Sequence, residues 1–269
     1  MCAAVELLYQ RFNLMPTLIF RICLVLSLLK LKNPEVHMIK GVAFDFDHTL
    51  YDRDATYEKL LHSFLEFFSE YLRKDISPEE VLAVIQRCDR SGIYKDGHWE
   101  GIYRDTLASG IFEKNPSYET YYEGFMENNY PQAIVLYRDT ISTLELLKKQ
   151  GYKVGILTNG PSEYQRAKVE LVHLHEYVDT VVVGGELPHS KPHPFAFEYT
   201  CKQLGCSLEE CAYVGDHPIN DIDGARNAGM TAIWIRSVGS WMEGIDSAPY
   251  FIDQLGELPE LLAKISQKM

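Results

Sequence analysis

Four aspartates, a threonine and a lysine stand in this 269-residue sequence where they could share one reactive site. Two of the aspartates, Asp45 and Asp47, follow a short apolar run and are two positions apart. Because side chains alternate along a strand, residues two apart share one direction if the strand geometry persists. One carboxylate could then attack as a nucleophile while the other gives or takes a proton.

The remaining candidates follow later apolar runs or precede a helix. They are Thr158 and Asn159, Lys191, and the pair Asp216 and Asp221. The four carboxylates would repel one another, so they stay ionised at neutral pH only beside a cation. Oxygen ligands without cysteine favour a hard, partly hydrated ion, which is Mg²⁺. Lys191 and the hydroxyl of Thr158 would then hold an anion, and the whole set predicts phosphoryl transfer.

The elements that must position these residues alternate between strand and helix patterns. Nearly continuous apolar runs predict strands that are buried on both faces. Strands that alternate with helices predict a parallel sheet covered by helices on both sides, in which ligands bind beyond the carboxyl ends of the strands. The predicted strands are 41–47, 153–158, 180–184, 211–215 and 230–235, and the predicted helices are 139–150, 162–175, 194–204 and 220–228.

One interval, residues 53–137, lacks this alternation and has the pattern of helices alone. Within it, Ser77 is a predicted helix cap and Pro78 suits the first helical position. We therefore expect a helical cap domain inserted between the first two strands, with residues 38–52 and 138–269 forming the α/β core. The helices predicted inside the insert are 55–72, 81–88, 103–110 and 118–128.

The motifs in this order resemble the haloacid dehalogenase (HAD) superfamily, and specifically its phosphatase branch, over about residues 39–260. The D-x-D-x-T motif of that family matches residues 45–49, and its Ser/Thr motif matches Thr158. Its lysine motif matches Lys191, and its G-D-x-x-x-x-D motif matches residues 215–221. The resemblance implies a Rossmann-like core with an α-helical cap of the family's first type.

The resemblance also implies a role for each matched residue. Asp45 would be the nucleophile and Asp47 the acid and base, and the second aspartate favours phosphate esters over the carbon–halogen bonds of the dehalogenases. Thr158, Asn159 and Lys191 would bind the phosphoryl group. The implied Mg²⁺ ligands are Asp45, the main-chain carbonyl of Asp47 and Asp216, with Asp221 supporting the site.

His48 departs from the family pattern, which often has glycine at this place. Any other residue restricts the backbone if the position requires a positive φ. A contact of His48 with the substrate or with the cap is an open alternative. Phosphomutases share the whole motif set, so the core motifs alone leave them as an alternative function, together with a non-catalytic phosphate-binding module.

Composition narrows the classes of partner. The chain has 26 basic and 38 acidic residues, for a formal net charge of −12, so nucleic acid is not expected as a partner. Its six cysteines form no CxxC pair, and we expect them to be buried thiols in a reducing, cytoplasmic compartment. The expected partner is a small phosphomonoester, such as a nucleotide monophosphate or a sugar phosphate, and the oligomeric state is left open.

Aromatic residues are frequent in the predicted cap. They either stack on a planar leaving group or form the core of a small helical domain, and we favour the core. The loops 89–92 and 95–99, with Arg90 and Lys95, are candidates for substrate specificity. The aromatic residues concerned are Tyr94, Trp99, Tyr103, Tyr118, Tyr121, Tyr122 and Tyr130.

Residues 1–37 do not match the rest of the chain. The run 14–31 is apolar enough to suggest a membrane span, but Arg21 stands near its centre, where a charge is costly. Met38 begins a segment that resembles a natural start before the first strand. We interpret residues 1–37 as an upstream extension, with a membrane-associated helix and a helix docked on the body as alternatives.

Overall fold

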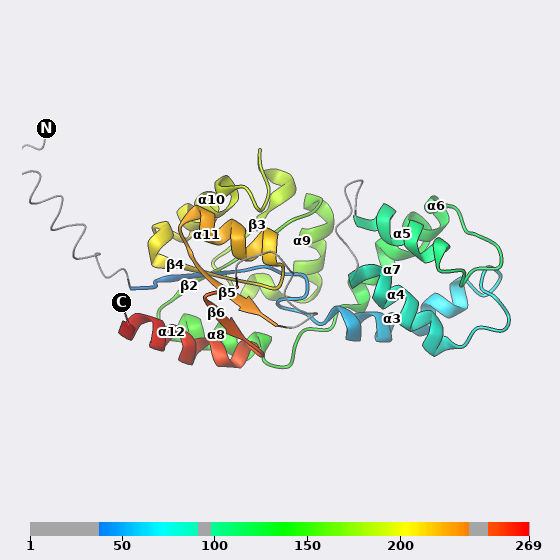
Figure 1. The fold of residues 1–269 in the computed structure, drawn as a ribbon, viewed down its shortest axis with the longest axis horizontal. Helices are drawn as coiled ribbons and strands as arrows, with labels where there is room; N and C mark the ends of the chain where they lie inside the picture. Colours follow the sequence, from blue (N-terminus) through cyan, green and yellow to red (C-terminus); the bar gives the residue numbers. More distant parts are fainter. Residues whose placement is uncertain (1–37, 91–97, 237–246, 269) are drawn as a thin grey trace, which may run out of the picture. The chain divides into compact units, whose positions relative to one another are not determined.

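Six parallel strands form the sheet that carries the candidate residues (Figure 1). Their order is β3-β2-β1-β4-β5-β6, and each neighbouring pair is parallel. The computed structural model describes residues 38–90, 98–236 and 247–268. The strands are β1 (Gly41–Phe44), β2 (Lys153–Thr158), β3 (Thr180–Val183), β4 (Cys211–Gly215), β5 (Thr231–Ile235) and β6 (Tyr250–Ile252).

All five predicted strands are present, and β6 is an additional strand at the edge of the sheet. The first strand is shorter than predicted, since β1 ends at Phe44 instead of residue 47. The chain turns there, because the amide of Leu50 donates to the carbonyl of Phe46 at 3.0 Å and His48 has a φ of 59°. Asp45 and Asp47 therefore lie on a turn rather than on one strand face.

Helices cover both faces of the sheet, as predicted (Figure 1). One face packs against α10 and α11 through a cluster that includes Ala43 and Phe197. The opposite face packs against α8, α9 and α12 through a cluster that includes Val42 and Phe44. The helices are α8 (Thr140–Lys149), α9 (Ser162–Leu171), α10 (Pro194–Leu204), α11 (Gly224–Ala228) and α12 (Leu258–Lys268).

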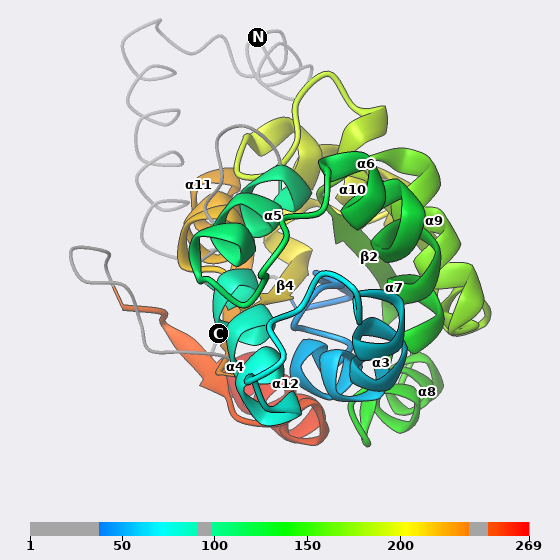
Figure 2. The ribbon, with the colours of Figure 1, turned by 90° about the vertical axis from the view of Figure 1, so that its right-hand side faces the viewer.

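The interval between β1 and β2 is helical, and Figure 2 shows these helices toward the viewer. Ser77 and Glu80 form a reciprocal capping box, because the Glu80 amide donates to Ser77 Oγ at 3.2 Å and the Ser77 amide donates to Glu80 Oε2 at 2.9 Å. The elements are α3 (Arg53–Phe67), α4 (Pro78–Arg90), α5 (His98–Ala108), α6 (Tyr118–Tyr121), the π-helix η1 (Tyr122–Met126) and α7 (Glu127–Ala133).

These helices have a hydrophobic cluster of their own. Phe64 and Phe68 lie at its centre, with ring centroids 4.5 Å apart, and Phe68 also contacts Tyr121 at 5.8 Å. Trp99, Tyr121 and Tyr130 are buried in this cluster, so the interpretation of the aromatic residues as core is confirmed for these three. Tyr103 and Tyr122 pack against the cluster while partly exposed.

The chain enters and leaves the α3–α7 region at one place. The amide of Asp52 donates to the carbonyl of Val135 at 2.8 Å, and Tyr51 forms a β-bridge with Leu136. The hydroxyl of Thr140 donates to the carbonyl of Leu50 at 2.7 Å. The two connecting segments are thus hydrogen-bonded side by side.

Some sequence predictions concern residues outside the described ranges. Residues 1–37, with the proposed extension or membrane helix, are among them, as are Tyr94 and Lys95. Within the described ranges, no helix has the length and apolar character needed to span a bilayer.

Candidate active site

Three carboxylates converge at the carboxyl edge of the sheet. Asp45 follows β1, Asp216 follows β4, and Asp221 lies in the π-helix η5 (Pro218–Asp223). Each offers a carboxylate oxygen, and these oxygens all lie within 4.8 Å of one another. The sequence prediction that these side chains meet at one sheet edge is therefore correct.

Gly215 allows Asp221 to lie against the end of β4. A Cβ at position 215 would lie 2.5 Å from Cβ, Cγ and Oδ2 of Asp221. Asp221 is only 1% exposed, and the main-chain amide of His217 donates to its Oδ2 at 2.9 Å. Gly215, the glycine of the G-D-x-x-x-x-D motif, therefore leaves the space that the side chain of Asp221 occupies.

Lys191 lies between two of the carboxylates. Its Nζ donates to Asp45 Oδ1 at 2.6 Å, to Asp221 Oδ1 at 2.7 Å and to the hydroxyl of Tyr213 at 2.7 Å. Burial opposes the charge of Lys191, but Asp221 and Asp45 outweigh it and raise the lysine pKa above its ordinary value. The ammonium is thus held in its charged form at the site.

One ammonium does not neutralise three carboxylates. Burial raises the pKa of Asp45 to about 7, with Asp221 and Asp47 adding to the effect and Lys191 opposing it. Burial also raises the pKa of Asp216 well above its ordinary value, with Asp221 and Asp45 as the next causes. These carboxyl groups therefore retain protons more readily than usual, and a further cation would favour their ionised forms.

Asp47 lies in different surroundings, and its side chain is not one of the three clustered carboxylates. Lys168 Nζ donates to its Oδ1 at 2.6 Å, Gln165 Nε2 donates to its Oδ2 at 2.8 Å, and the Tyr51 hydroxyl donates to Oδ1. Burial alone would raise the pKa of Asp47, but Lys168 and Arg53 outweigh burial and lower it below its usual range. Asp47 is therefore ionised in this state, which is the form that accepts a proton.

Thr158 and Asn159 lie at the end of β2 beside the cluster. Thr158 is buried, and its Oγ1 accepts a hydrogen bond from Gln165 Nε2 at 2.5 Å. Asn159 Oδ1 accepts from the main-chain amide of Lys191 at 3.0 Å, and its Nδ2 donates to the Lys191 carbonyl at 2.9 Å. The Asn159 side chain thus fixes the backbone of Lys191, and its predicted contact with phosphate stays a prediction.

His48 contacts the helical region. Its φ of 59° is the left-handed conformation, which costs a residue other than glycine about 1–2 kcal/mol. His48 Nε2 lies 3.5 Å from Asp89 Oδ2 on α4, and Asp89 also pairs with Arg53 and with His98. Of the two contacts considered for His48, the structure shows the one with the helical region.

Several residues of the site carried no signal in the sequence analysis. Tyr213 stands in an apolar strand run and Arg53 opens α3, while Asp89 begins the predicted loop 89–92 but lies in the last turn of α4. Gln165 and Lys168 offered a usable signal, because they are three positions apart on the helix that follows Thr158 and so share one helix face.

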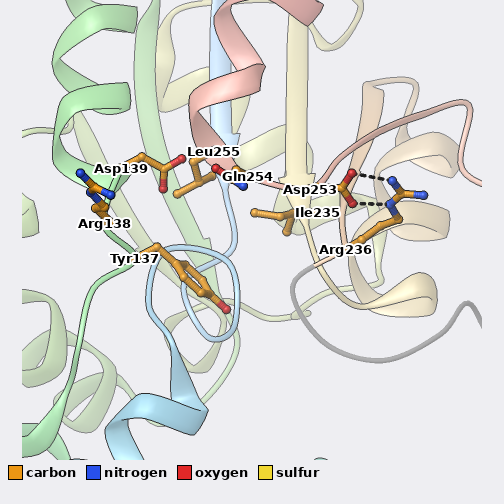
Figure 3. Close-up of a pocket in the computed structure, with 8 residues that line it drawn as sticks. All are labelled: Tyr137, Arg138, Asp139, Ile235, Arg236, Asp253, Gln254 and Leu255. Atoms are coloured by element: carbon orange, nitrogen blue, oxygen red, sulfur yellow. Dashed lines mark hydrogen bonds and ion pairs between the residues drawn. The ribbon is translucent and has the colours of Figure 1, made fainter.

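A cavity of about 330 Å³ lies at another part of the edge, beside the ends of β5 and β6 (Figure 3). Its lining includes Tyr137 and the paired side chains of Arg236 and Asp253, and none of the candidate residues lines it. The candidate catalytic residues therefore lie in the carboxylate cluster and not in this cavity.

Comparisons with known proteins agree on the type of enzyme. A family model described as haloacid dehalogenase-like hydrolase matches residues 42–235. The chain is 30% identical over 252 residues to N-acylneuraminate-9-phosphatase of Homo sapiens, covering 86% of this chain and 96% of that protein. It is 30% identical over 236 residues to glyceraldehyde 3-phosphate phosphatase of Methanocaldococcus jannaschii, covering 86% and 100%. A solved HAD phosphatase from Thermococcus onnurineus has a TM-score of 0.57 and 33% identity, covering 83% of this chain and 98% of that one.

Proposed function

Because this chain belongs to the haloacid dehalogenase-like hydrolases and is a phosphoric monoester hydrolase, we propose that it cleaves small phosphate esters with Mg²⁺ through a phosphorylated aspartate. The observation that carries the proposal is the convergence of Asp45, Asp216 and Asp221 around Lys191. This arrangement provides a nucleophile, an anion-binding cation and a set of oxygen ligands in one place.

The residues present fit Mg²⁺. The three clustered side chains offer only oxygen ligands, which suit this hard ion. Burial and the neighbouring carboxylates raise the pKa values of Asp45 and Asp216, so both groups ionise more readily when a cation is bound beside them. We propose Asp45, Asp216 and the main-chain carbonyl of Asp47 as ligands, with Asp221 supporting them. When bound, the ion would neutralise these carboxylates and the phosphoryl oxygens.

In the proposed first step, a carboxylate oxygen of Asp45 attacks phosphorus and the bond to the ester oxygen breaks. That oxygen takes a proton from Asp47 and departs as an alcohol. Asp47 is ionised in the structure and must take up a proton before this step, and the step returns it to the carboxylate that Lys168 and Gln165 contact. Asp47 then accepts a proton from water, the water oxygen attacks phosphorus, and the bond to Asp45 breaks to release inorganic phosphate.

We propose that the phosphoryl oxygens are bound by Lys191 and by the hydroxyl of Thr158, with Asn159 keeping Lys191 in place. We also propose that residues 53–137 act as a cap over a core of residues 38–52 and 138–269. The contact between His48 and Asp89 supports this assignment, because it joins the helical region to the turn that carries Asp47. The similar proteins are named for different substrates, so only a class is proposed, a sugar phosphate, a nucleotide monophosphate or a similar small ester.

The test is phosphate release by the purified full-length chain from a panel of phosphate esters, with Mg²⁺ and with EDTA. Asp45→Asn should abolish turnover, because an amide does not act as the nucleophile. Asp75→Asn is the matched control, since Asp75 is on the surface and pairs only with Arg73 among the described residues. Activity that persists in Asp45→Asn, or that is unchanged when EDTA removes the metal, would overturn the proposed mechanism.

A further inference from the structure

Two side chains of α9 outside the family motifs contact Asp47. Lys168 is only 2% exposed, and its Nζ donates to Asp47 Oδ1 at 2.6 Å and to the Tyr51 hydroxyl at 3.3 Å. Gln165 is buried as well, and its Nε2 donates to Asp47 Oδ2 at 2.8 Å. Each oxygen of the Asp47 carboxylate therefore accepts a hydrogen bond from the same helix.

The ammonium of Lys168 has a defined location. It lies 5.1 Å from the ring centroid of Phe46, 5.3 Å from that of Tyr51 and 5.4 Å from that of Tyr164. Aromatic faces attract a cation electrostatically at such distances, and more strongly when water is excluded. A lysine side chain is flexible in solution, but these three rings restrict the positions from which Lys168 can reach Asp47.

Gln165 joins Asp47 to the phosphate side of the site. The same Nε2 that donates to Asp47 lies 2.5 Å from Thr158 Oγ1 and 2.9 Å from the carbonyl of Asn159. The position of Asp47 is thus tied to the residues that follow β2. A carboxylate that transfers a proton must be held close to the proper geometry relative to the phosphoryl group.

We propose that Lys168 and Gln165 are positioning residues that hold the Asp47 carboxylate in line with the leaving-group oxygen. They act through Asp47 and touch neither the phosphoryl group nor the nucleophile. The inference rests on the proposed function, since it gives Asp47 the role of acid and base. If the proposal holds, replacing Lys168 or Gln165 should slow mainly the esters whose leaving oxygen requires a proton.

The leaving group separates this role from a general structural one. p-Nitrophenolate departs without protonation because it is a weak base, whereas the alkoxide of an alkyl ester requires a proton from Asp47. A displaced Asp47 should therefore slow the first step, transfer of the phosphoryl group to Asp45, far more for an alkyl phosphate such as glycerol phosphate than for p-nitrophenyl phosphate. A disrupted fold would slow both esters alike.

The experiment measures kcat and KM of the full-length chain for both esters, with Lys168→Met and Gln165→Met as separate variants. The comparison uses kcat/KM, which reports formation of the phosphorylated Asp45, because kcat also contains the hydrolysis step that both esters share and in which Asp47 acts as base. For glycerol phosphate, kcat/KM should fall by about 10- to 100-fold, within the range that misplacement of an acid–base group costs. For p-nitrophenyl phosphate, kcat/KM should fall by less than about threefold, because its leaving group needs no proton and Thr158 and Lys191 remain. Lys149→Met on the exposed face of α8 is the control and should match the wild type.

A double-mutant cycle adds a second readout. In an Asp47→Asn background, Lys168→Met should cause no further loss with glycerol phosphate, because the residue through which Lys168 acts is already disabled. Losses of kcat/KM that multiply in the cycle, or equal losses of kcat/KM with both esters, would overturn the inference, and the proposed function would stay intact if the wild type still requires Asp45. Gln165→Met keeps the test decisive if Lys168→Met does not fold, because it removes a neutral side chain and leaves Lys168 paired with Asp47.

Discussion

Replacing Gly215 with alanine tests whether packing beneath Asp221 sets the geometry of the carboxylate cluster. The added Cβ would lie 2.5 Å from three atoms of the Asp221 side chain, whereas ordinary van der Waals contact begins at 3.4 Å. Asp221 or the end of β4 must therefore move by roughly 1 Å. Asp221 resists this movement, because Lys191 Nζ and the His217 amide donate to it at 2.7 Å and 2.9 Å.

Two losses should follow from Gly215→Ala. Overpacking of a buried site costs about 1–3 kcal/mol, so the free energy of unfolding should fall by about 2 kcal/mol. A displacement of about 1 Å near reacting groups costs roughly 100-fold in rate, so kcat for phosphate release should fall by about that factor. Urea denaturation followed by circular dichroism measures the first loss, and steady-state kinetics with saturating Mg²⁺ measures the second.

Gly124→Ala in η1 is the matched control. Its Cβ would meet Phe67 Cζ at 3.5 Å and the Glu119 carbonyl at 3.6 Å, which are ordinary contacts. This variant should keep the activity of the wild type and the same stability to within about 1 kcal/mol. If Gly215→Ala behaves as Gly124→Ala does, the reasoning about Asp221 is refuted.

Three further predictions concern charge and packing. Mg²⁺ added to the metal-free protein should raise the melting temperature, because it relieves the repulsion among Asp45, Asp216 and Asp221, and at a hundred times its Kd the gain is about 2.7 kcal/mol; equal melting curves in Mg²⁺ and EDTA would contradict this. Asp89→Asn removes the buried partner of Arg53 and should lower the free energy of unfolding near neutral pH by about 3–5 kcal/mol. Although burial opposes it, pairing with Arg53 lowers the folded-state pKa of Asp89 below its ordinary 3.8, so this stabilisation is present above that value and is lost as pH falls through the folded-state pKa. Urea titrations of wild type and Asp89→Asn should therefore converge on acidification, and a constant gap would argue against the charge pair. Phe68→Ala removes a fully buried ring from the α3–α7 cluster and should cost about 3–5 kcal/mol, and a loss below about 1 kcal/mol in the same assay would show that the cavity collapses.

The sheet and the carboxylate cluster could be predicted because they follow from the order of strands and helices along the sequence. Apolar runs of four to six residues became strands, and the carboxyl ends of parallel strands lie at one edge. Asp45 and Asp216 follow such ends directly, and Asp221 lies in the short helix η5 that follows β4, so their meeting could be predicted without knowledge of side-chain packing. The edge strand β6 was missed because its three residues include the exposed Phe251, so it shows no buried apolar run.

The surroundings of Asp47 could not be predicted in the same way. Arg53 and Tyr51 reach it through the turn after β1, and that turn depends on the left-handed backbone of His48. The sequence pattern around Lys168 predicts an exposed charged residue on a helix. In the structure Lys168 is almost fully buried against aromatic rings. Charged residues are buried only where a partner compensates them, and a single sequence does not reveal the partner.

The hydrogen-bonded segments at Asp52 and Val135 also determine which parts of this fold can change in evolution. The two ends of the α3–α7 region are hydrogen-bonded to each other. The region is therefore connected to the sheet in the same way as a short loop, through two neighbouring chain segments. The chain entropy of closing such a loop grows only slowly with its length. Helices can therefore be lengthened, shortened or exchanged between these two anchor points at little cost to the core. Such changes would leave the edge of the sheet that carries Asp45, Asp216 and Asp221 unaltered.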